Sequence, residues 1–301
     1  MNYSLIEKIC EKYDTEFKYD EELSDYTSFH IGGKCDILVK PKNADCIAEI
    51  LECCRKNNIK YYILGKGSNV LVSDNGLRGV VIAVSSEMTN VWLTDDEHIY
   101  CDAGASLSKV CALAKENSLT GLEFAYGIPG SVGGALYMNA GAYGGEMKDV
   151  VEYCVYLDEE LKLRQMDVGD MNLSYRHSIF CEKNYVIIGV VLKLSKGDKS
   201  EITAKMSELM EKRRSKQPLE YPSAGSTFKR PEGDFAARLI EVSGLKGYSC
   251  GDAQVSEKHS GFVVNKGNAT FDDVMNVVKA VKEKVYADSG VMLECEILIL
   301  E

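Results

Sequence analysis

The sequence predicts an α+β protein of three lobes, because three stretches of the chain differ in character. Helices and strands alternate over residues 1–84, strands and glycine-rich loops dominate residues 85–197, and helices separated by proline and glycine fill residues 198–301. A chain of 301 residues is long enough for two or three domains. We therefore expect lobe boundaries near residues 84 and 197.

The first lobe shows short apolar runs and one helical pattern. Asp36–Val39, Tyr61–Leu64 and Val80–Val84 are runs of the kind that form strands. Asn43 is placed to cap a helix between the first two strands. The apolar positions of this helix are Ile47, Ile50, Leu51 and Cys54. These elements form a small α/β unit.

The second lobe is mostly β. Ser106 is placed to cap a helix that ends at about Glu116. The predicted strands are Tyr100–Ala103, Val150–Leu157, Leu161–Met166 and Val186–Leu194.

The third lobe contains three predicted helices. The first spans residues 200–216 and is followed by prolines that cannot continue it. The second, Asp234–Val242, carries Phe235, Leu239 and Val242 on one face and stops at Gly244. The third, Thr270–Ala287, opens with a capping box of Thr270 and Asp273. Its apolar face consists of Val274, Val277, Val278, Val281 and Val285.

Leu293–Leu300 is predicted as the last strand, and it is a candidate to pack back on the first lobe. Alternation places Glu294, Glu296, Leu298 and Leu300 on one face and Cys295, Ile297 and Ile299 on the other. A carboxylate in an apolar strand is costly unless it is paired. Glu296 therefore lies either at the exposed end of the strand or in a functional site.

Composition excludes several classes of protein. A net charge of −11 argues against nucleic-acid binding. No apolar run approaches the roughly 20 residues that cross a bilayer, and the N-terminal residues have no signal-peptide core, so we expect a cytoplasmic protein. The 11 cysteines lack a C-x-x-C pair and the four histidines lack ligand spacing, so we expect reduced thiols and no metal site.

An anionic ligand would need a local basic patch in this acidic chain. The candidates are Lys212, Arg213, Arg214 and Lys216, followed by Lys229 and Arg230. A solvated helix end is the plain alternative for this cluster.

Three glycine-rich segments are the strongest sign of chemistry. They are residues 64–69 (LGKGSN), 127–134 (GIPGSVGG) and 139–145 (NAGAYGG). Glycine lets the backbone approach a ligand closely, and successive free N–H groups can hold phosphate oxygens. One such loop more often makes only a tight turn, but three favour a dinucleotide-sized ligand. None fits the G-x-G-x-x-G or P-loop pattern.

Ordered motifs along nearly the whole chain resemble the UDP-N-acetylenolpyruvoylglucosamine reductase family, in its shorter subtype. The motifs are TSFHIGG (27–33), LGKGSNVL (64–71), GIPGSVGGA (127–135), NAGAYGGE (139–146), YRHS (175–178), AGSTFK (224–229), GDAQVS (251–256) and Lys258-His259. The resemblance implies a two-lobed FAD-binding fold of the vanillyl-alcohol-oxidase type, residues 1–84 and 85–197, with a C-terminal α/β substrate domain, residues 198–301.

The resemblance also implies the reaction. Through non-covalent FAD, NADPH would reduce UDP-N-acetylglucosamine enolpyruvate to UDP-N-acetylmuramate. Such an oxidoreductase is a flavoprotein of peptidoglycan synthesis and cell wall biogenesis, and through them of cell shape, the cell cycle and cell division. No second dinucleotide fold is visible, so NADPH and the sugar would use one cleft in turn. We expect a monomer whose partner is the nucleotide sugar.

By the same resemblance, Ser226 is the proton donor to C2, Arg176 stabilises charge at the substrate carboxylate, and Glu296 assists the enolate-like state. The expected cofactor-binding residues are Gly65, Lys66, Gly67, Ser68, Asn69, Val70, Pro129, Gly130, Ser131, Gly133, Gly134, Asn139, Ala140, Gly141 and Ala142. The expected substrate-binding residues are Lys216, Arg213, Tyr175, Lys229 and His259.

Some residues leave alternatives open. Ser226 can simply bond its own turn, and Glu294 is the rival of Glu296. Leu298 and Glu301 depart from the family's C-terminal pattern, and Arg230 replaces an asparagine found in some members.

Two other functions compete with the reductase. One is an oxygen-using flavin oxidase of the same fold, and the other is a non-catalytic nucleotide-sugar-binding regulator.

Overall fold

A computed structural model describes residues 3–301, which form two compact units. Unit 1 comprises the residues up to Tyr19, Asp36–Lys66 and Gly79–Lys212. Unit 2 comprises Asp20–Cys35, Gly67–Arg78 and Arg213–Glu301, so it is assembled from three separate segments. In the part of the chain that the structure describes, no helix is both long and apolar enough to cross a membrane.

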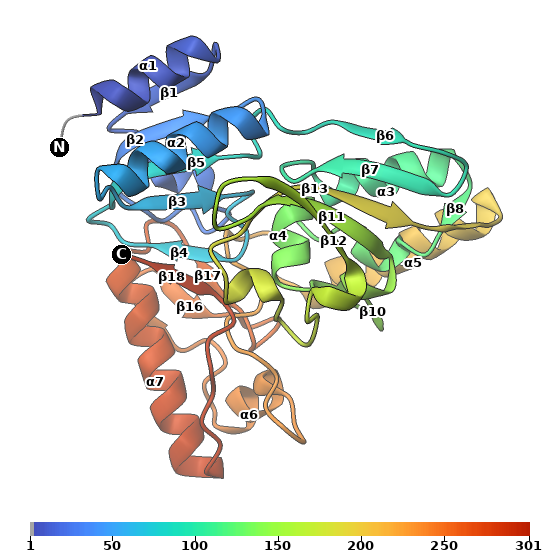
Figure 1. Ribbon diagram of the computed structural model, residues 1–301. Coiled ribbons are helices and arrows are strands. Elements are labelled where there is room, and N and C mark those ends of the chain that lie inside the picture. The colour runs from blue at the N-terminus through green and yellow to red at the C-terminus, as the bar shows by residue number, and fades with distance from the viewer. Residues whose placement is uncertain (1–2) are drawn as a thin grey trace. The chain divides into compact units, whose positions relative to one another are not determined.

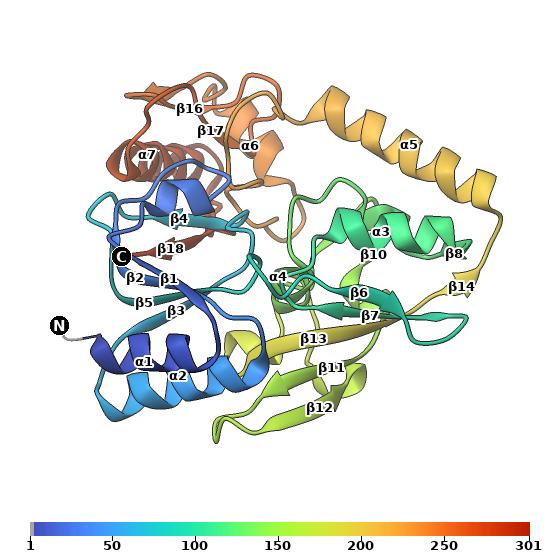
Figure 2. The same cartoon turned by 90° about the horizontal axis from the view of Figure 1, so that it is seen from above.

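The first sheet of unit 1 has the strand order β1-β2-β5-β3. Its strands are β1 (Glu16–Tyr19), β2 (Cys35–Lys40), β5 (Leu77–Ala83) and β3 (Tyr61–Leu64). Helices α1 (Ser4–Lys12) and α2 (Ala44–Lys56) lie side by side on one face of this sheet, as Figures 1 and 2 show. Apolar residues of both helices join Val80 and Ile82 in one buried cluster. Asn43 caps α2 by accepting from the Cys46 N–H at 2.9 Å, which confirms the predicted helix start.

The second sheet of unit 1 has five strands in the order β12-β11-β13-β7-β6. They are β12 (Leu163–Asp167), β11 (Val151–Leu157), β13 (Val186–Lys193), β7 (His98–Asp102) and β6 (Val91–Leu93). Register pairs Cys154 with Val190 and Val190 with Cys101, so these residues share one face. Apolar side chains of helices α3 (Leu107–Glu116) and α4 (Val132–Tyr137) pack in the buried cluster on that face.

Short ladders and most of one long helix, up to Lys212, complete unit 1. Strands β8 (Leu119–Thr120) and β14 (Ser195–Lys196) pair, as do β9 (Gly141–Ala142) and β10 (Gly145–Glu146). Helix α5 (Lys199–Lys216) follows β14, and Asp198 accepts from the N–H groups of its first turn.

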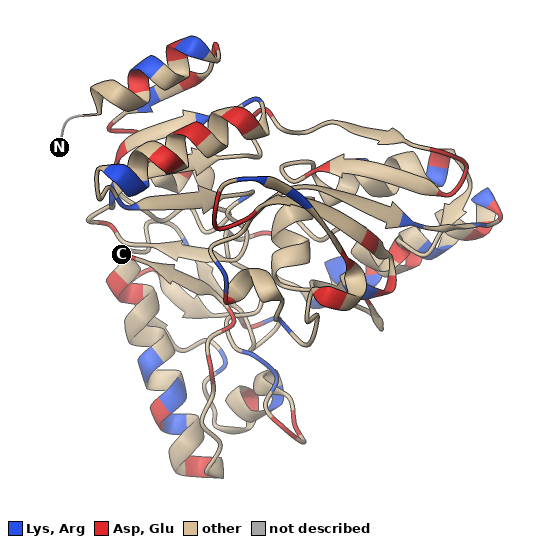
Figure 3. Cartoon of the chain, viewed as in Figure 1, with Lys and Arg blue, Asp and Glu red and all other residues tan. Residues whose placement is uncertain are grey.

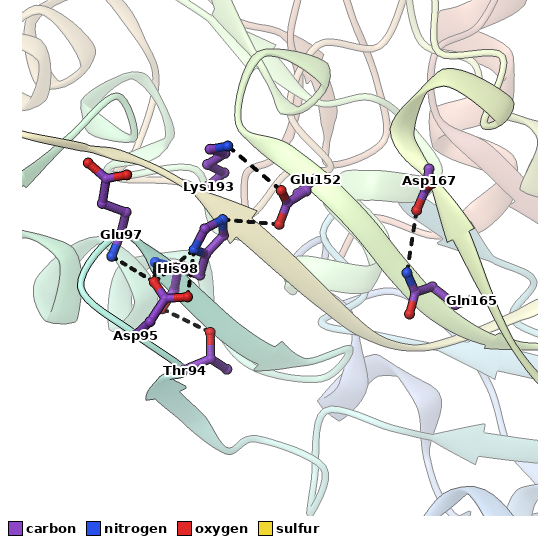
Figure 4. A network of polar contacts seen from close by, with 8 residues as sticks. All are labelled: Thr94, Asp95, Glu97, His98, Glu152, Gln165, Asp167 and Lys193. Atoms are coloured by element: carbon purple, nitrogen blue, oxygen red, sulfur yellow. Dashed lines mark hydrogen bonds and ion pairs between the residues drawn. The ribbon is translucent and has the colours of Figure 1, made fainter.

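A polar network lies on the five-stranded sheet (Figure 4). The His98 Nδ1 lies 2.7 Å from the Asp95 carboxylate, and its Nε2 lies 3.1 Å from Glu152. Lys193, which pairs in register with His98, is 3.9 Å from the same Glu152. The hydrogen bond to Asp95, followed by the charge of Glu152, raises the pKa of His98 above its ordinary value. The network therefore joins β7, β13 and the start of β11 through one histidine whose charged form is stabilised by its carboxylate neighbours.

Unit 2 has its own core. Its regular elements are β4 (Val70–Val72), α6 (Ala236–Val242), β15 (Ser249–Cys250), β16 (Ala253–Val255), β17 (Val263–Asn265), α7 (Phe271–Ser289) and β18 (Leu298–Leu300). Strands β15, β16 and β17 form an antiparallel sheet, and β18 pairs in parallel with β4. The five valines predicted on α7 are all buried, and the capping box of Thr270 and Asp273 is present. The last strand thus pairs with residues of the first 84, as considered above.

Two elements differ from the sequence analysis. Phe235 and Val242 were expected on the apolar face of α6, but they are 56% and 65% exposed, and the helix buries Ala236, Leu239 and Ile240 instead. The last strand was predicted over Leu293–Leu300 but spans only Leu298–Leu300, because β4 offers only three partner positions. Glu294 and Glu296 therefore lie before the strand.

Charged side chains are mixed on the helices, and most cysteines are buried. Acidic and basic residues are interspersed along α2, α5 and α7 (Figure 3). All 11 cysteines are free thiols, and eight of them are buried. Burial raises the pKa of Cys111 to about 12, so this thiol stays protonated at neutral pH.

Candidate active site

Gly65 of the first glycine loop and Ser131 of the second meet within unit 1. Gly65 directly follows β3, and a Cβ placed on it would lie 2.4 Å from the Ser131 Oγ of the GIPGSVGG segment. Ser131 is 2% exposed and caps α4 by accepting from the Gly134 N–H at 3.3 Å. Ser85 fixes the same corner by donating to the Gly65 carbonyl at 2.8 Å. Only glycine at position 65 permits this approach.

Both loops offer hydrogen-bond donors to an anion. Among residues 3–301, no hydrogen bond uses the backbone N–H of Lys66, Gly67 or Ser68. The same holds for Gly130 and Ser131. Successive free N–H groups beside small residues form a concavity that suits phosphate oxygens. Gly65, Lys66, Gly130 and Ser131, which all belong to unit 1, fit the diphosphate of a dinucleotide, and we call these four residues the phosphate cradle.

Other glycines of these motifs serve packing and turns. Gly133 donates to the Ala103 carbonyl at 2.8 Å, and a Cβ on it would lie 2.8 Å from the Ala103 Cβ. The third motif forms the hairpin of β9 and β10. Its two turn residues, Tyr143 and Gly144, have φ of +54° and +92°, as a tight type I′ connection requires. Gly145 packs on Phe124, because a Cβ there would come within 2.6 Å of its ring.

The remaining expected cofactor-binding positions occupy three places. Asn69 donates from its side chain to the Glu296 carbonyl at 3.2 Å, and Val70 opens β4. Pro129 and Gly134 are exposed, on either side of the cradle residues 130–131. Ala140, Gly141 and Ala142 are half-buried at the start of the hairpin, whereas Asn139 is fully buried.

Arg176 sits in a strained two-residue turn. Ser174 and His177 form an isolated antiparallel bridge with two mutual hydrogen bonds of 3.2 Å, so Tyr175 and Arg176 are the turn residues. Arg176 has a φ of +53°, a conformation that costs a non-glycine residue about 1–3 kcal/mol. Its guanidinium carbon lies 5.0 Å from the centre of the Tyr175 ring, which is a cation–π distance. Tyr175 is half exposed.

In unit 2, Ser226 and Glu296 belong to adjacent backbone segments. Glu296 N–H donates to the Thr227 carbonyl at 2.9 Å, and Lys229 N–H donates to the Glu294 carbonyl at 2.9 Å. Ser226 itself bridges to Phe262. These antiparallel contacts place the backbone segment of the predicted proton donor beside that of the predicted carboxylate. Arg176 belongs to unit 1.

The hydrogen bonds do not support the alternative that the Ser226 hydroxyl only bonds its own turn. In the described part of the chain, the bond within this turn runs from the Gly225 N–H to the Ser223 hydroxyl at 3.4 Å, and none involves the Ser226 hydroxyl. Ser226 is half-buried, so its hydroxyl remains available as a donor.

The two glutamates differ in exposure. The Glu294 side chain is 74% exposed and lies 3.4 Å from the Lys229 ammonium, a surface ion pair. Glu296 is half-buried, between the backbone contacts of Asn69 and Thr227. The surroundings therefore fix the position of Glu296 more firmly than that of the exposed Glu294.

The TSFHIGG motif supports the serine segment. Ser28 donates from its hydroxyl to the Ser223 carbonyl at 2.7 Å, and the Ser223 N–H donates to the Ser28 carbonyl at 3.1 Å. The side chain of Asn265 donates to the Phe29 carbonyl at 3.2 Å. The sequence does not reveal this structural role of the motif, because its partners lie about 200 residues away in the chain.

The expected substrate-binding cations have unequal surroundings. Lys216 ends α5 and is exposed, whereas Arg213 is only 7% exposed and donates to the side-chain amide oxygen of Gln217 at 3.0 Å. The basic cluster is therefore not a uniform solvated helix end.

Burial lowers the pKa of His259, and its Nδ1 accepts from the Gly261 N–H at 3.2 Å, so the imidazole is neutral at pH 7.

Comparisons with known proteins agree with this geometry. Residues 35–160 match the family model described as FAD binding domain. Residues 217–300 match the model described as UDP-N-acetylenolpyruvoylglucosamine reductase, C-terminal domain.

Similar proteins cover nearly the whole chain. The UDP-N-acetylenolpyruvoylglucosamine reductase of Clostridium tetani is 48% identical over 94% of this chain and 92% of its own. That of Caldanaerobacter subterraneus subsp. tengcongensis is 49% identical over 93% and 92%. A crystal structure of the Thermus caldophilus reductase matches with a TM-score of 0.80 at 33% identity, over 95% of this chain and 99% of that one. The predicted fold class and the expectation of FAD are thereby confirmed, and the chain belongs to the UDP-N-acetylenolpyruvoylglucosamine reductase family.

Proposed function

We propose that this chain catalyses the NADPH-dependent reduction of UDP-N-acetylglucosamine enolpyruvate to UDP-N-acetylmuramate, a step of peptidoglycan precursor synthesis. FAD, held by residues of the glycine-rich loops 65–70 and 129–134, would supply the hydride-transfer chemistry that links NADPH to C3 of the enolpyruvyl group. The observation that carries the proposal is the pairing of the Ser226 segment with the Glu296 segment, inside the stretch that matches the reductase family model.

Ser226 acts as the general acid. Adding hydride to C3 leaves negative charge at C2, and this basic carbon takes the hydroxyl proton of Ser226. A serine hydroxyl is a weak acid, so it gives up its proton only where such a base develops. The unused hydrogen-bonding capacity of Ser226 supports this role.

Glu296 and Arg176 stabilise the charge that develops during the reaction. Glu296, acting as an acid or through a hydrogen bond, assists the enolate-like state of the carboxylate. Arg176 presents a planar guanidinium, which pairs with a carboxylate through two parallel hydrogen bonds. The strained φ of +53° supports a functional role for this residue.

The other assigned residues bind the ligands. Residues 65–70 and 129–134 bind FAD, and the unused main-chain N–H groups of Lys66, Gly130 and Ser131 would hold its diphosphate. Residues 139–142 line the cofactor through their main chain. Lys216, Arg213, Tyr175, Lys229 and His259 bind the nucleotide sugar. Positive charge is needed there because a net charge of −11 repels a dianionic diphosphate.

The three lobes divide these tasks. Residues 1–84 and 85–197 bind FAD, and residues 198–301 bind the sugar. We propose a cytoplasmic monomer, because the nucleotide sugar and NADPH are soluble and no step requires a second subunit.

The test separates the two half-reactions under anaerobic conditions. NADPH should bleach the flavin, and the enolpyruvyl sugar, but not oxygen, should restore its colour rapidly. Ser226→Ala should leave bleaching nearly intact and slow recolouring by about 10²–10⁴-fold, the usual loss for a general acid. This corresponds to about 3–5 kcal/mol of barrier.

Other outcomes would contradict the proposal. Fast recolouring by oxygen alone would indicate an oxidase, and a protein that binds the sugar without turnover would indicate a regulator. Equal damage to both half-reactions in Ser226→Ala would remove Ser226 from the proton-donor role.

A further inference from the structure

Asn139 directly follows α4 and is fully buried, with 0% exposure and a φ of +41°. A buried side-chain amide is costly unless its donors and acceptor are used. All of its polar atoms are used. The Nδ2 donates to Glu146 at 2.7 Å and to the Ser174 carbonyl at 3.1 Å, and the Oδ1 accepts from the Lys148 N–H at 2.9 Å. The side chain is thus committed to the protein itself.

The bond to Ser174 matters because Ser174 is next to the turn that contains Arg176. Ser174 forms one end of the bridge that closes the Tyr175–Arg176 turn. Asn139 therefore fixes the entry to the turn, one residue before the Tyr175–Arg176 pair. The strained φ of Arg176 persists only where the surroundings impose it. The bridge between Ser174 and His177 contributes only two hydrogen bonds, so the tether from Asn139 adds to the restraint on the turn.

The exit from the turn is held at the same place. The Ser178 hydroxyl donates to the Tyr137 carbonyl at 2.6 Å, and Ser178 has 0% exposure. Tyr137 is the last residue of α4, so both tethers meet residues 137–139. The entry and the exit of the turn are thus anchored on one short stretch of backbone.

That stretch lies at the C-terminal end of α4, and residues 130–131 of the phosphate cradle lie at the N-terminal end of the same helix. Ser131, at the other end of α4, caps the helix and contacts Gly65. A helix of six residues is about 9 Å long and stiff, so a displacement at one end reaches the other. α4 therefore sets the position of the Arg176 turn relative to residues 130–131 of the cradle, all within unit 1.

We propose that the Asn139 side chain is a positioning residue for Arg176, which it serves by tethering Ser174 to the end of α4. The inference rests on the proposed function of Arg176 and extends it to a residue that touches neither the substrate nor the flavin through its side chain. The proposed cofactor contact of residues 139–142 then belongs to the main chain.

The main test uses Asn139→Gly. Glycine accepts the φ of +41° without strain, so the variant removes the three hydrogen bonds and leaves the backbone allowed. The matched control is Asn58→Gly, an exposed asparagine of unit 1 with a φ of +51°. The holoenzyme variants are compared in both anaerobic half-reactions and in backbone hydrogen exchange at Ser174 and His177.

We expect three results for Asn139→Gly. Reoxidation by the enolpyruvyl sugar slows about 10–100-fold, as small misplacements of a catalytic group do. Reduction by NADPH and FAD retention stay within about twofold. Exchange at Ser174 and His177 accelerates at least about tenfold, since the turn opens more often. Asn58→Gly changes none of these quantities.

A double-variant cycle separates this inference from the proposed role of Arg176. Arg176→Lys alone should slow the sugar step, and adding Asn139→Gly to it should slow the step less than about threefold further, because the two residues act on one interaction. If Arg176→Lys leaves the sugar step unchanged, the proposed function of Arg176 is wrong, while the exchange data still report on the tether. If Arg176→Lys slows the step but Asn139→Gly changes neither rate nor exchange, the positioning role is wrong.

Two further outcomes are decisive. Loss of FAD with equal slowing of both half-reactions in Asn139→Gly would make the side chain a cofactor contact and overturn the inference. Should the glycine variant not fold, Asn139→Asp replaces it. Aspartate keeps the acceptor for Lys148, removes the donors and places a second carboxylate beside Glu146, so slowing of the sugar step and faster exchange at Ser174 are expected. Wild-type values for both would overturn the inference.

Discussion

Gly65→Ala tests whether the two cradle loops abut as described. The new Cβ would lie 2.4 Å from the Ser131 Oγ, well below the 3.0 Å that real Cβ atoms keep. The Ser131 side chain must rotate away, and it then gives up its bond to the Gly134 N–H. Loss of such a cap costs about 0.5–2 kcal/mol, and overpacking of a site that is 2% exposed adds to it. We expect a destabilisation of about 1–3 kcal/mol.

The compensating change is Ser131→Gly. Glycine serves as a cap at a cost of only a few tenths of a kcal/mol, and it removes the clashing oxygen. The Ser131 Cβ would lie 3.5 Å from the new Cβ at position 65, an ordinary contact, so the oxygen is the obstacle. Alanine at 65 also restricts the unfolded chain, which stabilises a protein by about 0.4–1 kcal/mol. The double variant should therefore lie within about 0.5 kcal/mol of the parent.

Urea unfolding of the apoproteins, followed by circular dichroism, gives the free energies of unfolding. The cycle should yield a coupling of at least about 1 kcal/mol between positions 65 and 131. FAD affinity should fall in Gly65→Ala and recover in the double variant, since both loops are proposed to hold the diphosphate. Additive free energies, or a destabilisation in Gly65→Ala that Ser131→Gly leaves in place, would refute the contact.

Two further predictions concern ionisable groups. Glu296→Gln should slow recolouring by the sugar while Glu294→Gln leaves it within about twofold, and the reverse result in the same anaerobic assay would transfer the role to Glu294. The raised pKa of His98, held by Asp95 and Glu152, stabilises the fold fully below its unfolded pKa near 6.5, and this stabilisation is lost as pH rises through the folded pKa. His98→Gln should thus destabilise more at pH 5.5 than at pH 9 in urea unfolding, and an equal loss at both would contradict the ion pairs.

Elements fixed by local signals were predictable from sequence. The caps of α2, α3 and α7 are side chains within three residues of the groups they bond, so Asn43, Ser106 and Thr270 indicated them. The valines of α7 repeat at helical spacing along one face, and their burial followed. Where the signal and its partner are neighbours in the chain, pattern and structure agree.

Elements fixed by distant partners were not. β4 was missed and β18 was drawn too long, because each exists only by pairing with the other across more than 220 residues. The seven residues of α6 are too few for periodicity to identify the buried face, so Phe235 and Val242 were misplaced. The same distance hid the tether from Asn139 to Ser174.

The pairing of β4 with β18 also bears on how the chain is made. Phe29, Ile31 and Leu71 lie in the unit 2 core with Ile297, so their partners are synthesised last. At about 5–20 residues per second, the intervening 220 or so residues take roughly 10–45 s. Through most of that interval these apolar side chains have no native core to enter, because the other members of the cluster begin at Ala224. A nascent chain halted before residue 224 should therefore hold residues 20–35 and 67–78 open to chaperones, while the sheets of unit 1 can already close.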